Sequence, residues 1–224
     1  MDVLCIADIH GDRGALRDLV KVAGDAGIGH VLILGDFPPH SAFGDAERLL
    51  EEVRFTLDAL CDLEVLAIPG NCDSLEVLDV FDEYGVSLHE KSVKLGDTAL
   101  VGLGGSAKTP FGTPFEMSED VIYEKLDALL SRLSGERVVV AAHNPPLDTN
   151  CDLRSSGDHV GSTAMRDIIE KFQPSVFLCS HIHESGGSSD KIGGTYVANI
   201  GPLSRHRMGI LRIGKRIDVE LGVF

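Results

Sequence analysis

Seven side chains able to bind a divalent cation follow short apolar runs along this chain. Asp8 and His10 come directly after the apolar residues 3–7. Four later apolar runs are followed by Asp36, by Asn71, by His143, and by the pair His181 and His183. Polar groups at the end of an apolar strand mark the place where the strand leaves its sheet. Ligands of open α/β sheets bind outside the carboxyl ends of the strands. Carboxylate, imidazole and amide ligands suit hard or borderline divalent ions, so the pattern predicts a metal site at one sheet edge.

The first of these pairs can be interpreted in two ways. Asp8 and His10 are two residues apart, so in an extended chain both side chains point to the same side and form half of a metal site. Alternatively, Asp8 caps the following helix and His10 lies in a polar turn. The repetition of the pattern after four further apolar runs favours the metal site.

The number of ligands indicates two ions rather than one. Six or seven such groups are too many for one ion with an open position, but they suit two ions that share a carboxylate. Paired ions serve phosphatases, nucleases and aminopeptidases, in which they clamp a phosphoryl or carbonyl oxygen and activate water. The residues therefore predict a hydrolase, and hydrolysis of a non-phosphate ester or amide remains chemically possible.

Length and composition limit the other possibilities. The chain has 224 residues and fits one domain over residues 1–224. A formal net charge of −15 argues against a nucleic-acid-binding surface. No apolar stretch approaches the ~18 residues of a membrane span, and no signal peptide is recognisable. The five cysteines include no CxxC pair, and the expected location is cytoplasmic.

The elements that must position these residues can be predicted from periodicity. Apolar residues at helical spacing predict helices at about 12–26, 45–60, 74–84, 118–133 and 162–172, interleaved with strands. Strand-like pieces are denser at 86–104 and 189–224. Residues 104–117 are rich in Gly, Pro and Thr and predict a long ordered loop, which is often functional. Two sheets packed face to face with helices outside would bury all of these elements.

The motifs resemble, in order and spacing, those of the calcineurin-like metallophosphoesterase superfamily. They are Asp8-x-His10, Gly35-Asp36, Gly70-Asn71-x-Asp73, His143 and His181-x-His183. The resemblance implies an α/β fold, a four-layer αββα sandwich of two mixed β-sheets flanked by helices, with a dinuclear centre. It also implies that one ion is held by Asp8, His10 and His183, that the other is held by Asn71, His143 and His181, and that Asp36 bridges them.

The resemblance further implies a reaction. A metal-bridging hydroxide would attack phosphorus in line, and the ions and Asn71 would stabilise the developing charge. Both ions would be divalent, with manganese expected first and iron, zinc or nickel as alternatives. The substrate would be a small phosphate ester, without a membrane or nucleic-acid partner.

The chain departs from the commonest family pattern at Cys72, where many members have a histidine that assists the leaving group. The sequence Gly-Asn-Cys-Asp is similar to that of small prokaryotic phosphodiesterases of the superfamily, so a phosphodiesterase is expected by analogy. A thiol replaces an imidazolium poorly. His159 is the candidate for the missing general acid. The open alternative is that His159 is only a histidine in a surface loop. His40 is a weaker candidate.

Other residues and functions stay open. Arg205 and His206 either contact phosphate or form a solvated turn, Ser106 and Lys108 could line a substrate pocket, and no role is expected for His30 and His89. The alternative functions are a phosphomonoesterase or nucleotidase at the same site, or a non-catalytic metal-binding scaffold of the retromer-subunit type. The complete set of motif ligands favours an enzyme over a scaffold.

Overall fold

The computed structural model of the protein describes residues 1–42 and 44–224, and the side chain of His40 also lies outside the described part. The prediction for His40 therefore concerns a side chain outside the described residues. None of the described helices combines the length and the apolar composition that a membrane span requires.

One sheet contains the strands nearest the N-terminus and the C-terminus. Its strand order is β13-β12-β1-β2-β3. The bounds are β1 Asp2–Ile6, β2 His30–Ile33, β3 Glu64–Ala67, β12 Arg207–Ile213 and β13 Ile217–Val223. β1, β2 and β3 are parallel, whereas β12 pairs antiparallel with both β1 and β13. The carboxyl ends of β1, β2 and β3 therefore meet at one edge.

The other large sheet has the order β10-β11-β9-β8-β5-β4. Its strands are β4 Lys91–Leu95, β5 Thr98–Leu103, β8 Arg137–Ala142, β9 Val176–Cys179, β10 Ser189–Ile192 and β11 Thr195–Asn199. The inner strands β5, β8, β9 and β11 are parallel, and antiparallel strands flank them on both sides. A small parallel pair joins β6 Ser106–Ala107 to β7 Glu116–Met117 at the two ends of the predicted loop.

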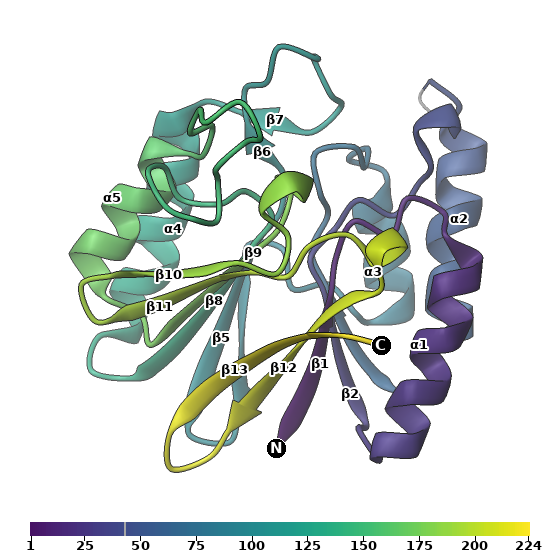
Figure 1. Cartoon of the computed structure of the whole chain (residues 1–224), viewed down its shortest axis with the longest axis horizontal. Helices are drawn as coiled ribbons and strands as arrows, with labels where there is room; N and C mark the ends of the chain where they lie inside the picture. The colour runs from purple at the N-terminus through teal and green to yellow at the C-terminus, as the bar shows by residue number, and fades with distance from the viewer. Residues whose placement is uncertain (43) are drawn as a thin grey trace.

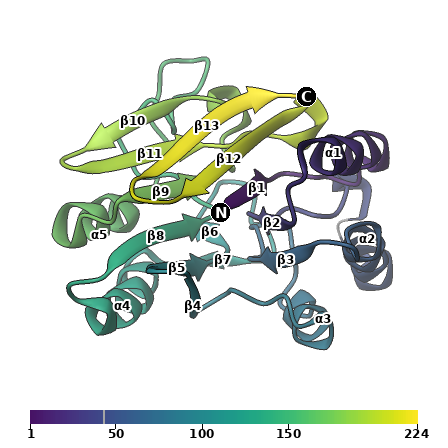
Figure 2. The same cartoon turned by 90° about the horizontal axis from the view of Figure 1, so that it is seen from below.

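Helices cover the outer face of each sheet. The helices on the first sheet are α1 Arg13–Ala26, α2 Ala46–Ala59 and α3 Val77–Tyr84, and those on the second are α4 Glu119–Leu130 and α5 Thr163–Phe172. Single 3₁₀ turns occupy η1 His40–Ala42, η2 Ser131–Leu133, η3 His183–Ser185 and η4 Leu203–Arg205. Figures 1 and 2 show the two sheets between the two groups of helices. The predicted four-layer sandwich is confirmed.

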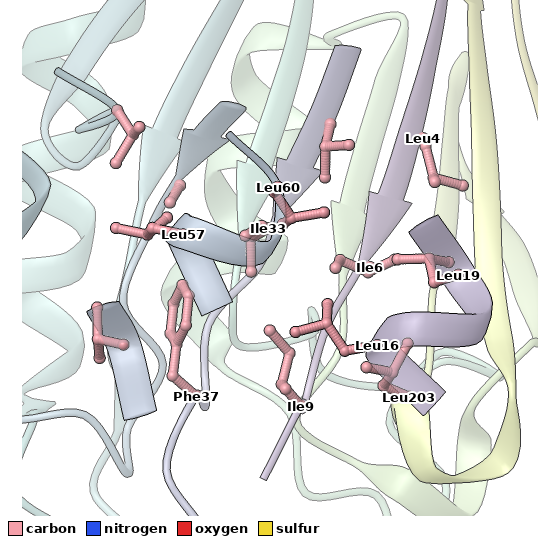
Figure 3. Packing of buried hydrophobic residues seen from close by; sticks show 14 of the residues in the cluster. Leu4, Ile6, Ile9, Leu16, Leu19, Ile33, Phe37, Leu57, Leu60 and Leu203 are labelled. Carbon is pink, nitrogen blue, oxygen red and sulfur yellow. The ribbon is translucent and has the colours of Figure 1, made fainter. Parts of the chain in front are cut away.

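The alternation of side chains along β1 shows why its apolar run is continuous. Leu4 and Ile6 point outward and pack with Leu16 and Leu19 of α1, as Figure 3 shows. Val3 and Cys5 point the other way and join the core between the two sheets. A strand buried on both faces needs apolar residues at every position, and the first polar site residue, Asp8, comes two residues after the strand ends at Ile6.

Candidate metal centre

The chain segments that follow β1 and β2 are joined by backbone hydrogen bonds. The amide of Asp8 donates to the carbonyl of Gly35 at 2.9 Å, and the amide of His10 donates to the carbonyl of Asp36 at 2.9 Å. From the second sheet, His143 follows β8 directly, and His181 comes two residues after β9. Both sheets thus deliver site residues to the same edge of the sandwich.

The backbone at these residues is left-handed. Asp8, His10, Asp36 and His181 have φ of +47°, +46°, +58° and +68°. The extended backbone expected at Asp8 and His10 is therefore wrong, because β1 ends at Ile6 and the chain turns at both residues. Their ligand atoms nevertheless lie within 4.8 Å of each other. Left-handed conformations of non-glycine residues cluster at functional sites, where the surrounding structure enforces them.

One group of candidate ligands consists of Asp8, His10 and His183, each of which has a ligand atom within 4.8 Å of those of the other two. The Nε2 atoms of His10 and His183 lie 3.3 Å apart, and His183 Nε2 lies 3.5 Å from Asp8 Oδ2. These are the three residues for which the resemblance implies one shared ion. The structure brings them together from three separate segments of the chain.

A second group contains Asp8, Asp36 and His143. His143 Nε2 lies 3.5 Å from Asp36 Oδ2 and 2.9 Å from Asn71 Oδ1. The ring of His181 lies edge-on to that of His143, with the centroids 5.1 Å apart. The structure therefore places Asn71, His143 and His181 beside one another, as expected for a second ion.

The hydrogen bonds of His143 test whether this site fits a cation. Its Nδ1 lies 2.6 Å from the carbonyl oxygen of Leu34, which can only accept, so Nδ1 carries the hydrogen. In the neutral ring, Nε2 is then an acceptor that faces the acceptors Asn71 Oδ1 and Asp36 Oδ2. Such converging acceptors need a positive charge between them, either a proton or a metal ion.

The first ligand group shows the same arrangement. His10 Nδ1 lies 3.2 Å from the carbonyl oxygen of Pro38, which directs Nε2 toward His183 and Asp36. Asp8 is fully buried, and its Oδ1 has no hydrogen-bond partner among the described residues. A histidine ligand that donates its other N–H to a carbonyl is typical of metal sites. The donor set and the unpartnered carboxylate oxygen fit divalent metal ions.

The electrostatics of the site favour a cation as well. Burial tends to raise the pKa of Asp36, but His143, His10 and the amide of Cys72 together outweigh burial and keep that pKa below its usual range. Burial likewise tends to lower the pKa of His143, but Asp36 and Asp8 raise that pKa to about 9. The carboxylates therefore stay ionised and create a negative potential that binds protons or metal ions.

Asp73, for which no role of its own was expected, holds the loops that carry these ligands. Its Oδ2 accepts from the amides of Asp36 and Gly70 at 2.8 and 2.6 Å, and its Oδ1 accepts from the amide of Phe37 at 3.0 Å. Asp73 is fully buried. The sequence feature that could have indicated this role is the place of Asp73 in the Gly70-Asn71-x-Asp73 motif.

Two further side chains contact the ligands. Ser180 is buried directly after β9, and its hydroxyl donates a hydrogen bond to Asp8 Oδ2. The other carboxylate oxygen, Oδ1, does not take part in this bond. Cys72 is buried next to Asn71, and its amide donates to Asp36 Oδ1 at 2.8 Å. Burial, and then the negative charge of Asp36, raise the pKa of the Cys72 thiol far above its usual range. Cys72 is therefore a neutral thiol at this site.

His159 lies on the long segment between β8 and α5. Its Nδ1 is 2.7 Å from Oδ1 of the buried Asp152, which also accepts from the amides of Thr149 and Gly161. The pairing with Asp152 raises the pKa of His159. The same segment contacts the 3₁₀ turn η3 that begins at His183, because Ser185 Oγ donates to the carbonyl of Leu153 at 2.5 Å.

Most of the remaining candidates lie away from the ligand side chains and make other contacts, or are exposed. Arg205 Nη1 donates to the carbonyl of His183 at 2.9 Å, and the ring of His206 packs against Phe224. Ser106 is buried in β6, and Lys108 is exposed in the loop that follows. Of the two histidines without an expected role, buried His89 accepts from the amide of Gly104, and His30 lies beside Glu64 on the surface.

Comparison with known families identifies this arrangement. The model of the calcineurin-like phosphoesterase family matches residues 1–185, which include every predicted ligand. The chain belongs to this family. Membership makes the protein a phosphoesterase that works with divalent metal ions, and it confirms the resemblance seen in the motifs.

Known relatives of this phosphoesterase agree in length and fold. An uncharacterized protein of Methanocaldococcus jannaschii is 36% identical over 209 residues, which are 91% of this chain and 89% of that protein. The crystal structure of TT1561 of Thermus thermophilus has a TM-score of 0.72 at 19% identity, covering 99% of this chain and 98% of that chain. A dimetal phosphatase from Danio rerio has a TM-score of 0.73 at 16% identity, and the match covers 99% of this chain and 95% of that chain.

Proposed function

We propose that the protein is a dinuclear phosphodiesterase that hydrolyses a small phosphate ester. The observation that carries the proposal is the position of Asp36 Oδ2, which lies 3.8 Å from His10 Nε2 and 3.5 Å from His143 Nε2. One carboxylate oxygen thus faces both ligand groups, as a bridging ligand must. The solved dimetal phosphatase from Danio rerio and a solved archaeal phosphodiesterase with a TM-score of 0.53 share the fold.

In this proposal, Asp8, His10 and His183 would hold one ion. Asn71, His143 and His181 would hold the other, and Asp36 would serve both. When bound, the ions supply Lewis-acid activation of the phosphoryl group and an activated water. Manganese is the first candidate, with iron, zinc and nickel as alternatives.

The chain's own residues orient this chemistry. The carbonyls of Leu34 and Pro38 fix the rings of His143 and His10 with Nε2 directed inward. Asn71 contributes through Oδ1, because its Nδ2 contacts Thr113 Oγ1 at 2.9 Å and Cys72 Sγ at 3.7 Å. Since these contacts determine positions before substrate binds, little reorganisation is needed during the reaction.

His159 is the proposed general acid in place of Cys72. Its contact with Asp152 raises the pKa of His159 and so favours the protonated ring, which can give its proton to a leaving oxygen from Nε2. His159→Ala should reduce turnover of diesters with poor, alkyl leaving groups far more than turnover of p-nitrophenyl diesters. Equal effects on both substrates would remove His159 from the mechanism.

The principal experiment compares hydrolysis of bis-p-nitrophenyl phosphate and p-nitrophenyl phosphate by metal-stripped protein after Mn²⁺, Ni²⁺ or Zn²⁺ is restored. Diester turnover that depends on the metal, is lost in His143→Ala and is kept in the surface control His30→Ala would support the proposal. Turnover of the monoester alone would indicate a phosphomonoesterase. Two bound ions without turnover of either substrate would favour the metal-binding scaffold.

A further inference from the structure

We infer that Thr113 and Glu116 form a positioning pair that fixes the side-chain amide of Asn71 with its oxygen toward the metal centre. The inference rests on the proposed function, because it assumes that Asn71 Oδ1 is a metal ligand. It adds a role for the loop of residues 104–117, which none of the predicted ligands occupies.

The loop is attached directly to the segment that carries Asn71. The amide of Phe115 donates to the backbone carbonyl of Asn71 at 3.0 Å, and the amide of Gly105 donates to the carbonyl of Pro69 at 2.9 Å. The pairing of β6 with β7 closes the base of the loop. In Figure 1 the loop beyond β6 and β7 projects from the top of the molecule, above the strands of the second sheet.

The direction of each hydrogen bond follows from the chemistry of Glu116. Glu116 Oε1 lies 2.6 Å from Thr113 Oγ1 and 2.8 Å from the amide nitrogen of Thr113. Hydrogen bonds from Thr109 and Thr113 outweigh the effect of burial and lower the pKa of Glu116, so the carboxyl group is ionised. A carboxylate can only accept, so the hydroxyl hydrogen of Thr113 points at Glu116.

The lone pairs of the Thr113 hydroxyl are therefore left for Asn71. The amide group of Asn71 at Nδ2 donates to Thr113 Oγ1 over 2.9 Å, and Asn71 Oδ1 consequently faces His143 Nε2 at 2.9 Å. The two ends of an amide have nearly the same shape, so packing alone distinguishes them poorly. A rotation by 180° would direct the NH₂ group at the cation and remove a ligand. The Thr113–Glu116 pair disfavours that rotation, because it would also place Oδ1 against a hydroxyl oxygen whose hydrogen is engaged.

The test compares Thr113→Val with Thr113→Ser and with a matched control. Valine keeps the shape but removes the hydroxyl, serine keeps the hydroxyl, and Thr109→Val removes a different hydroxyl that also donates to Glu116 Oε1, at 2.6 Å. Isothermal titration of the metal-free proteins with Mn²⁺ measures binding without reference to activity. We expect one of the two binding events to weaken roughly 10- to 100-fold in Thr113→Val, as for other groups that orient a ligand. The other two variants should stay within about threefold of the wild type.

Two further readouts separate positioning from a general structural effect. In Thr113→Val, the side-chain amide resonances of Asn71 should shift, and kcat for bis-p-nitrophenyl phosphate should fall more than KM rises. Glu116→Gln, which removes the obligate acceptor, should weaken the same binding event. Wild-type affinity and unchanged Asn71 resonances in Thr113→Val would overturn the inference while leaving the proposed function intact. A wild-type protein that binds no metal ion would overturn both.

Discussion

Individual residues of this site hold conformations that their types rarely adopt. Asp8, His10, Asp36 and His181 all have positive φ, and each such residue costs on the order of 1–2 kcal/mol relative to a glycine. Aspartate and asparagine tolerate this region better than most residues, because their short polar side chains form local hydrogen bonds. A substitution that tests chemistry at these positions should therefore preserve that tolerance.

Asp36→Asn meets this requirement and removes the charge proposed to lie between two ions. The amide can still accept from the amide of Cys72, as Asp36 Oδ1 does at 2.8 Å. We expect metal content after dialysis and phosphoesterase activity to fall at least about 100-fold, because the ligand charge is lost with little change in the backbone. Asp97→Asn, which alters a surface carboxylate beside Arg137, should change neither quantity. Two firmly bound ions in Asp36→Asn would contradict the bridging role.

The pair of His159 and Asp152 predicts a pH dependence of stability. Hydrogen bonding to Asp152 raises the pKa of His159 in the folded protein above the value of about 6.5 in the unfolded chain. The charged pair therefore contributes its full stabilisation below about pH 6.5, and the contribution is lost as pH rises through the raised pKa. Urea unfolding of metal-free protein should show His159→Gln to be less stable than wild type at pH 5.5, with a smaller difference at pH 9. A difference independent of pH would show that protonation of His159 contributes nothing.

At the scale of elements, the ends of β2 and β3 approach so closely that they exclude a side chain. A Cβ added to Gly70 would lie 2.1 Å from Asp36 Oδ1 and 2.5 Å from the amide nitrogen of Asp36. A Cβ on Gly35 would lie 2.1 Å from the amide nitrogen of Gly70. The two glycines therefore let Asp36 and Asn71 emerge side by side from neighbouring strands.

Gly70→Ala tests this close approach. The added methyl group must displace Asp36, so we expect a loss of about 1–3 kcal/mol in the free energy of unfolding and weaker metal binding. Gly24→Ala is the matched control, because a Cβ at Gly24 in α1 meets nothing within 4 Å. That control should gain about 0.5–1 kcal/mol from the better helix propensity of alanine. Urea denaturation and Mn²⁺ titration of both variants distinguish the outcomes, and unchanged metal affinity in Gly70→Ala would refute the argument.

The elements themselves could largely be predicted from the sequence, because their signals are local. Asp12 caps α1 by accepting from the amide of Ala15, and left-handed Gly27 ends the same helix, which matches the predicted limits within one residue. The apolar runs before Asp8 and His143 are strands of two different sheets. At the start of the strand-rich stretch predicted at 86–104, Ser87 and His89 form only single β-bridges.

What the sequence could not supply are contacts between distant segments. Nothing local to Thr113 indicates that its hydroxyl contacts Asn71, which lies 42 residues earlier. The left-handed backbone at Asp8 depends on hydrogen bonds with the segment after β2, so a strand pattern alone predicts an extended chain there. The Thr113–Asn71 contact and the backbone at Asp8 both depend on how separate segments pack at the sheet edge. The periodicity of residues within one element does not predict that packing.

On the scale of the whole molecule, the candidate metal centre joins the two sheets. Asp8, Asp36 and Asn71 come from the sheet that contains β1, whereas His143 and His181 come from the sheet that contains β8. Below the site, an apolar core packs residues such as Leu32 and Leu178 between the sheets. The buried carboxylates of Asp8 and Asp36 above this core repel one another, and in the metal-free protein the protonated ring of His143 offsets part of that repulsion.

Metal ions should therefore stabilise the folded protein as a whole. Each ion bound only by the folded state adds about 2.7 kcal/mol when its free concentration is 100 times its Kd. For a chain of this size that corresponds to a rise in Tm of roughly 5–10 °C per ion. Calorimetry with Mn²⁺, followed by excess chelator, measures the effect, and the rise should be reversed by the chelator. His143→Ala should show a smaller rise, because it removes a ligand supplied by the second sheet. A Tm that is identical with metal and with chelator would mean that the ligands do not hold ions in the folded state.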